Sequence, residues 1–147
     1  MEKFPLNKVD YYDTFEEFLQ GIVNHYGDKP AISYFTRNKQ KKSYTYRELR
    51  DQVFALREML CILGLSGKKI GIVGVNSYQW IVAYLAIASC GSVAICVDID
   101  QSDNNIRNML RLADADVAFV SSGYLDICKP LLNTAGGIEK LLLLDYG

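Results

Sequence analysis

The feature that most constrains the fold of this sequence is a stretch without any charged side chain, residues 70–97. A membrane-spanning helix needs roughly 20 consecutive, predominantly apolar residues. Here polar residues interrupt the stretch at NSYQ (76–79) and again around GS (91–92). The uninterrupted apolar run, residues 80–88, is too short to cross a bilayer. The stretch therefore predicts a strand, a buried helix and a second strand of one βαβ unit.

The same alternation continues to the end of the chain. Short apolar runs at residues 69–75, 92–97, 117–121 and 140–145 alternate with segments of helical length at 77–90, 102–113 and about 124–132. Continuously apolar strands separated by helices are typical of a parallel sheet covered on both faces, with right-handed crossovers. The sequence therefore predicts an α/β fold with a largely parallel sheet and helices on both faces.

The first part of the chain predicts two helices around a hairpin. Thr14 and Glu17 have the spacing of a capping box, which predicts a helix to about residue 26 that ends at Gly27. The β-rich segments 31–37 and 43–46 flank a polar NKQKK run and predict a hairpin. A second capping-box pair, at residues 45 and 48, introduces an amphipathic helix that ends at residue 64.

Length and composition are those of one compact domain. The chain has 147 residues, a formal net charge of -1 at pH 7 and 50% hydrophobic residues, which is typical of a single globular domain. We expect a single domain over residues 1–147, with 1–13 as an N-terminal extension and 14–147 as the α/β unit. The N-terminus shows no apolar signal region, so we expect a cytoplasmic protein.

The charge balance predicts no nucleic-acid partner, because such binding sites show a clustered excess of Lys and Arg. For the same reason no anionic-lipid site is evident. Only Lys39, Lys41 and Lys42 approach a basic run. They lie in a polar loop between two short apolar runs, so we expect a solvated turn rather than a phosphate-binding patch.

The cysteines give no sign of a metal site or a disulfide framework. Residues 61, 90, 96 and 128 lie in apolar segments without a CxxC pair, and His25 is the only imidazole. A zinc site requires close-spaced Cys and His pairs. We therefore expect reduced thiols in the core.

Two glycine-containing motifs resemble phosphate sites but lack the required context. GLSGKK (64–69) precedes a strand, whereas a phosphate-binding P-loop follows a strand and opens a helix. A helix end followed by a turn explains it better. Gly71 and Gly74 lie within the predicted strand and lack the third glycine of a dinucleotide fingerprint. Tight backbone packing is the simpler interpretation of Gly71 and Gly74.

Paired carboxylates follow the predicted strand at 92–97. Asp98 and Asp100 stand at the edge where open α/β sheets place ligands. Together they could hold Mg²⁺, although loop carboxylates near a helix start are the commoner outcome. Asn76, between a strand and a helix, is predicted to be an N-cap or turn residue.

Two further single residues are candidates for structural roles. Trp80 lies one turn into the buried helix and is predicted to be a core anchor rather than a ligand-stacking residue. Trp80→Ala should then destabilise the protein by roughly 3–5 kcal/mol. His25, at a predicted helix end, has no evident nucleophilic partner. We expect it to lie at the surface or to interact with the C-terminal helix dipole.

Three segments in order resemble a known family: SYTYRELRDQV (43–53), the stretch from KKIGIVGVNSYQW to AICVDID (68–100) and SDNNIRNMLRLADADVAFVS (102–121). They are similar to the opening of AMP-binding, adenylate-forming enzymes, which include acyl-CoA synthetases, peptide-synthetase adenylation domains and luciferases. The resemblance covers the chain from about Tyr12 onward. NSYQW (76–80) and YDTF (12–15) look most like long-chain fatty acid CoA ligases.

The resemblance implies the N-terminal subdomain of the acyl-CoA synthetase-like fold. In this family a carboxylate reacts with ATP and Mg²⁺ to give an acyl-adenylate and pyrophosphate, and the acyl group is then transferred to CoA. The substrate would be a fatty acid or another carboxylate. The matching segments mainly build scaffold, so no catalytic, cofactor-binding or metal-binding residue is assigned within this chain.

The sequence departs from the family pattern at two points. Cys96 stands where the family usually has proline, two residues before Asp98. The Ser/Thr/Gly-rich phosphate loop with its lysine is not found before Gly147. We therefore expect the front portion of a ligase that is inactive in isolation, binds no cofactor alone and has the rest of its polypeptide as partner. An exposed apolar surface should favour self-association.

Two alternative functions remain open from the residues. One is a stand-alone, non-catalytic binding or regulatory domain derived from the same family. The other, supported by fold analogy alone, is a small nucleotide-binding α/β domain.

Overall fold

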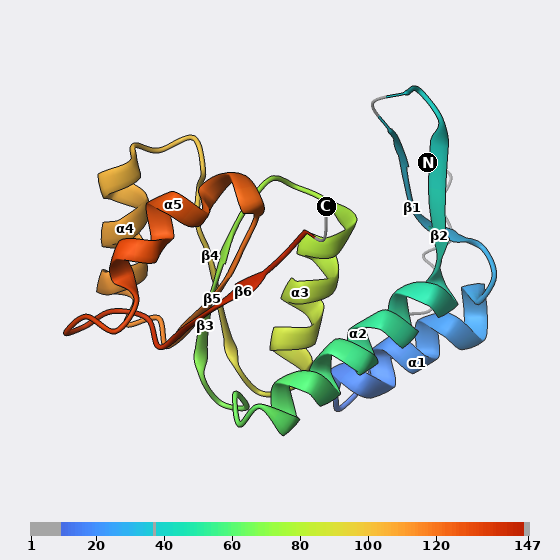
Figure 1. Cartoon of the computed structure of the whole chain (residues 1–147). Coiled ribbons are helices and arrows are strands. Elements are labelled where there is room, and N and C mark those ends of the chain that lie inside the picture. Colours follow the sequence, from blue (N-terminus) through green and yellow to red (C-terminus); the bar gives the residue numbers. More distant parts are fainter. Residues whose placement is uncertain (1–9, 37, 146–147) are drawn as a thin grey trace, which may run out of the picture.

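The computed structural model describes residues 10–36 and 38–145 (Figure 1). Most of the predicted N-terminal extension lies outside this range, as do residues 37, 146 and 147. The elements are α1 (Phe15–Tyr26), β1 (Pro30–Phe35), β2 (Lys41–Thr45), α2 (Tyr46–Ile62), β3 (Lys69–Val73), α3 (Tyr78–Ser89), β4 (Val93–Cys96), α4 (Asp103–Leu112), β5 (Val117–Val120), η1 (Ser122–Tyr124), α5 (Leu125–Cys128), η2 (Lys129–Leu131) and β6 (Lys140–Leu143).

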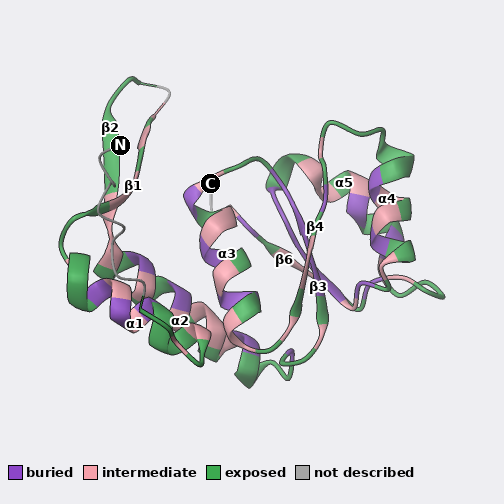
Figure 2. Ribbon diagram, turned by 180° about the vertical axis from the view of Figure 1, so that it is seen from behind, coloured by how far each residue is buried: buried purple, intermediate pink, exposed green. Residues whose placement is uncertain are grey.

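Four strands form a parallel sheet in the order β4-β3-β5-β6. The predicted α/β class, the parallel sheet and all four of its strands are confirmed. The strands are four or five residues long, and β3 and β5 are almost wholly buried because both of their faces are covered (Figure 2). This explains why they are continuously apolar rather than alternating.

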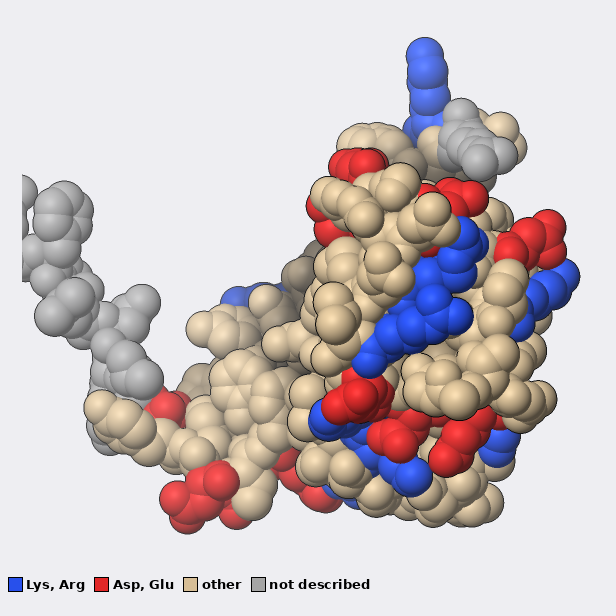
Figure 3. Space-filling model, turned by 90° about the vertical axis from the view of Figure 1, so that its left-hand side faces the viewer, with Lys and Arg blue, Asp and Glu red and all other residues tan. Residues whose placement is uncertain are grey.

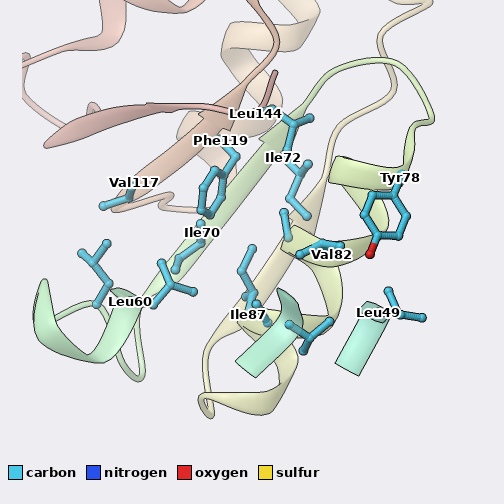
Figure 4. Close-up of a cluster of buried hydrophobic side chains, with 14 of the residues drawn as sticks. Leu49, Leu60, Ile70, Ile72, Tyr78, Val82, Ile87, Val117, Phe119 and Leu144 are labelled. Carbon is cyan, nitrogen blue, oxygen red and sulfur yellow. The ribbon is translucent and has the colours of Figure 1, made fainter. Parts of the chain in front are cut away.

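Alternate residues of β3 face opposite sides of the sheet, and each side has its own cluster of buried side chains. Ile70 and Ile72 face α3 and α2, where the larger cluster of buried side chains lies (Figure 4). Gly71 and Val73 face α4 and the segment around α5, where Ile106 and Leu110 belong to the second cluster. Helices therefore cover both faces of the sheet, as the sequence predicted.

The starts of α1 and α2 test the two predicted capping boxes. At α2 the box is complete: Thr45 Oγ1 accepts the N–H of Glu48 at 3.1 Å, and the Glu48 carboxylate accepts the N–H of Thr45 at 2.7 Å. At α1 Thr14 caps Glu17 in the same way, but the Glu17 carboxylate accepts the N–H of Asp13. The reciprocal half of that prediction is therefore wrong.

The hairpin is confirmed as an antiparallel pair, and it forms a separate two-stranded sheet. It projects away from the parallel sheet and stands above α1 and α2 in Figure 1. Its base contacts the rest of the molecule through Tyr44, whose ring stacks on that of Tyr78 in α3.

The predicted continuous helix at 124–132 is wrong. The structure has three short pieces there, η1, α5 and η2, and the longest spans four residues. Pro130 accounts for the end of α5 at Cys128, because proline has no N–H to bond to the preceding turn. Within residues 10–36 and 38–145, no helix is long and apolar enough to cross a membrane.

Candidate functional site

The carboxyl ends of the four parallel strands meet at one edge of the sheet. The chain passes from β3 to β4 on one side and then to β5 on the other, so the strand order reverses between β3 and β5. Open α/β sheets bind ligands at such a switch point. A ligand site at this switch point would therefore be formed by the residues that follow β3 and β5.

At this point the space between the strands is already filled. A Cβ atom added to Gly74 would collide with the hydroxyl of Ser121 and approach Leu144 Cδ2 to 2.9 Å. Ser121 is buried, and its N–H donates to the carbonyl of Val73 at 2.8 Å. The glycine thus allows close packing, as the sequence predicted.

A serine and an aspartate link the ends of β5 and β6. The N–H of Ser122 donates to Asp145 Oδ1 at 2.7 Å, and its hydroxyl donates to Asp145 Oδ2 at 3.2 Å. Sequence reasoning did not identify this pair. The available signal was a polar residue two positions beyond the end of each of two strands, which a parallel sheet brings to the same edge.

The start of α3 decides between the two roles predicted for Asn76, an N-cap or a turn residue, in favour of the turn. The N-cap is Ser77, whose hydroxyl accepts the N–H of Trp80 at 3.1 Å. Asn76 is exposed and lies in the turn before it. Both residue types are good caps, and the sequence pattern did not distinguish two adjacent candidates.

Asp98 stabilises the turn between β4 and α4. Its carboxylate accepts the N–H of Asp100 and the side-chain amide of Gln101, both at 3.0 Å. The hydrogen bond from Gln101, followed by that from Asp100, lowers the pKa of Asp98. In the described part of the chain no three His, Cys, Asp or Glu side chains form a potential metal site. The observed role of Asp98 is to hold the turn after Cys96.

A largely apolar cleft of about 310 Å³ lies between α2, α3 and the strands β5 and β6. Its lining consists of Gln52, Ala55, Leu56, Met59, Gln79, Val82, Ala83, Phe119, Leu143 and Leu144. We call it the α2–α3 cleft. It combines an apolar wall with two glutamine side chains that can orient a ligand through hydrogen bonds.

A second cavity, of about 440 Å³, separates β1 from the start of α3. Tyr78 contributes to its wall and is 3% exposed. The Tyr78 hydroxyl is buried without a hydrogen-bond partner among the described residues. Burial, more than the nearby Tyr44 and Glu48, raises the pKa of Tyr78, so this hydroxyl stays protonated at neutral pH.

Trp80 packs against the larger core cluster from its edge rather than lying inside it, so the predicted core anchor is confirmed only in part. It is half-buried, and its ring stacks on that of Tyr84 with centroids 5.7 Å apart and an interplanar angle of 9°. Tyr78 is the aromatic residue of α3 that enters the core. His25 lies at the end of α1 as expected, where its Nδ1 donates to the carbonyl of Gly21 at 3.0 Å.

The predicted placement of the cysteines is wrong for two of the four. All four are free thiols, but Cys61 and Cys96 are exposed, Cys90 is half-buried and Cys128 is fully buried. Burial raises the pKa of Cys128 to about 11. Cys61 lies on the outer face of α2 and Cys96 at the end of an edge strand, so their apolar sequence neighbours did not indicate burial.

The three segments with family resemblance form one continuous frame of α2, β3, α3, β4, α4 and β5. The family profile described as AMP-binding enzyme matches residues 19–143. The chain belongs to the AMP-binding enzyme family. The matched residues include the whole four-stranded parallel sheet and the helices on both of its faces.

Relatives within the AMP-binding family are much longer than this chain. It is 27% identical over 143 residues to a mitochondrial medium-chain acyl-CoA ligase from Danio rerio, covering 90% of this chain and 23% of that protein. It is 23% identical over 130 residues to a CoA ligase from Gibberella moniliformis, covering 84% and 21%. The chain thus spans less than a quarter of either.

Solved structures show the same fold. A Mycobacterium tuberculosis fatty acyl CoA synthetase has a TM-score of 0.73 at 13% identity, with 88% of this chain and 26% of that chain covered. The A-PCP didomain of a carboxylic acid reductase from Segniliparus rugosus, solved with AMP, has a TM-score of 0.77 at 17% identity, with 95% and 22% covered. These similarities confirm the predicted fold of the amino-terminal part of adenylate-forming enzymes.

Proposed function

We propose that this chain is the amino-terminal part of an ATP-dependent acyl-CoA synthetase. The observation that carries the proposal is the family match over residues 19–143, together with curated relatives that are named as CoA ligases. The reaction joins a carboxylate, such as a fatty acid, to ATP with Mg²⁺ and then transfers the acyl group to CoA. In that reaction these residues supply scaffold.

We also propose that the 147 residues form no adenylate by themselves. Their carboxyl edge is occupied by internal contacts, such as the Ser122–Asp145 pair, and the sequence contains no Ser/Thr/Gly-rich loop ending in lysine. The test mixes the chain with ATP, Mg²⁺ and palmitate and measures acyl-AMP. Formation above the background of a heat-denatured sample would disprove this proposal.

A polypeptide that extends these residues into a phosphate loop is the matched positive sample. We expect it to form acyl-AMP and, with CoA, an acyl thioester. ATP, Mg²⁺ and CoA are thus the proposed cofactors of the longer protein, and the remainder of that polypeptide is the main proposed partner. If this longer polypeptide forms no thioester with a short, a medium or a long fatty acid, the proposed activity is contradicted.

The α2–α3 cleft supports a second candidate, a non-catalytic binding domain. The side chains that line it come from α2, α3, β5 and the end of β6 and are largely apolar. A fatty acid that binds the chain without ATP, and whose affinity falls in Ala83→Phe, would support this function. We further propose that residues 14–147 form one folding unit, which a single urea transition would support. We also propose that the protein works in a reducing compartment such as the cytoplasm, where its four cysteines stay free thiols.

A further inference from the structure

The total charge is near neutral, but basic and acidic residues are unevenly distributed along the chain. Between Asp28 and Glu48 the sequence has six basic residues and no acidic one. The remainder of the chain has 10 basic and 17 acidic residues. The basic segment is the hairpin with its flanks, so one projecting element carries a positive charge and the rest of the molecule is acidic.

The lysines of this hairpin lack partners that would neutralise them. Lys39, Lys41 and Lys42 are exposed, and none of them forms an ion pair with a carboxylate of residues 10–36 or 38–145. By contrast, Lys68, Lys69 and Lys129 all pair with aspartates. Figure 3 shows a basic side chain that projects from the top of the molecule, where Figure 1 places the hairpin.

An apolar side chain lies among these lysines. Phe35 is 73% exposed, and it lies opposite Lys41 in the register of the hairpin. Directly opposed residues of an antiparallel pair project on the same face. One face of the hairpin therefore presents an exposed aromatic ring beside the ammonium group of Lys41. Lys42 is opposite Tyr34 and projects on the other face, where its ammonium group lies 5.2 Å from the centroid of the Tyr44 ring.

We propose that Phe35, Lys39, Lys41 and Lys42, here called the hairpin patch, dock the protein onto bilayers that contain anionic phospholipids. Lysine side chains near such a surface are attracted by its negative potential, and an exposed aromatic ring can enter the boundary between headgroups and acyl chains. A projecting element reaches a flat surface without obstruction, and repulsion of the acidic remainder leaves the hairpin as the face that approaches it.

This inference goes beyond the proposed ligase function and does not depend on it. It also revises the expectation of a merely solvated turn, because Lys41 and Lys42 lie in β2 rather than in the loop. The net charge of the whole sequence does not reveal the hairpin patch, because acidic residues elsewhere in the chain balance its lysines.

The test is sedimentation of the 147-residue chain with vesicles. We expect binding to phosphatidylcholine vesicles that contain roughly 30% phosphatidylserine and much weaker binding to phosphatidylcholine alone. The variant K39Q/K41Q/K42Q should lose on the order of 100-fold in partitioning, at about fivefold per lysine. Phe35→Ser should lose about tenfold. The arginine variant K39R/K41R/K42R should bind like the wild type.

The matched control is R111Q/K129Q/K140Q, which removes three exposed positive charges outside the hairpin. It should bind as the wild type does, and circular dichroism should show that every variant is folded. Equal loss in the control would overturn the assignment to the hairpin. Binding to heparin or RNA through these lysines, without binding to vesicles, would overturn the lipid partner.

Discussion

The ring of Tyr44 lies parallel to that of Tyr78, with centroids 3.5 Å apart and an interplanar angle of 6°. This stack is one of the contacts that connect the hairpin to the buried face of α3. It also covers a hydroxyl group that has no hydrogen-bond partner among the described residues.

Removing that hydroxyl should stabilise the protein. A buried polar group without a partner destabilises the folded state by about 1–3 kcal/mol, so Tyr78→Phe should raise the free energy of unfolding by about 1 kcal/mol. Urea denaturation measures the change. Tyr84→Phe is the control, because Tyr84 is 40% exposed and its hydroxyl can reach water. A less stable Tyr78→Phe variant would reveal a hydrogen bond that the structure does not show.

The two capping threonines should differ in their effect on stability. Thr45→Ala removes one side of a complete capping box and should lower the free energy of unfolding by about 1 kcal/mol or more. Thr14→Ala should have a smaller effect, since the Glu17 carboxylate bonds to Asp13 and remains in place. Thermal unfolding of both variants gives the comparison, and equal losses would contradict it.

A methyl group at Gly74 should be poorly tolerated. It would collide with the Ser121 hydroxyl, and overpacking of a filled core typically destabilises by about 1–3 kcal/mol. We therefore expect Gly74→Ala to lower the urea midpoint clearly. Gly123→Ala is the control, because its added Cβ meets nothing within 4 Å. Adding Ser121→Gly should recover part of the loss if the clash is the cause.

The turn at Asp98 should give an acid-dependent contribution to stability. The folded-state pKa of Asp98 is lowered by Gln101 and Asp100, so its contribution is present above the unfolded value of about 3.9 and is lost as pH falls through the lower folded value. Asp98→Asn should therefore flatten the stability profile between about pH 2 and 4. Asp100→Asn, with the same charge change, should keep the steeper profile.

Strand β6 should promote self-association at high concentration. Among residues 10–36 and 38–145 it pairs with β5 alone, and Leu143, which lines the α2–α3 cleft, is 46% exposed. Unpaired edge strands are templates for pairing with another chain. Light scattering should show dimers or larger species, which Leu143→Lys reduces. Leu112→Lys, at an exposed residue of α4, should change nothing, and a strict monomer at all concentrations would contradict the prediction.

Sequence patterns predicted the sheet strands and α2 well because neighbouring residues in the chain determine both. The strands are short apolar runs between helices, and α2 combines a capping box with a regular apolar face. Trp80 was predicted too deep in the core because α3 has no charged residue on any side, so periodicity could not show which face enters the core. The stack of Tyr44 on Tyr78 joins segments far apart in the chain, and no local pattern indicates it.

The candidate site was less predictable than the fold. The Ser122–Asp145 pair and the α2–α3 cleft depend on which strands become neighbours, and only the tertiary structure fixes that order. Asp98 was correctly placed at the carboxyl edge. Its hydrogen bonds to the turn could not be read from the spacing of two aspartates.

The central position of β3 has a consequence for the way this protein is made. The strand lies between β4 and β5, so its second neighbour is complete only when the chain has been synthesised to about Val120. Translation at about 5–20 residues per second leaves the uncharged segment 70–97 without that neighbour for roughly one to five seconds. Ribosome-associated chaperones that recognise apolar segments therefore have their main opportunity to bind this chain while β5 is still unmade.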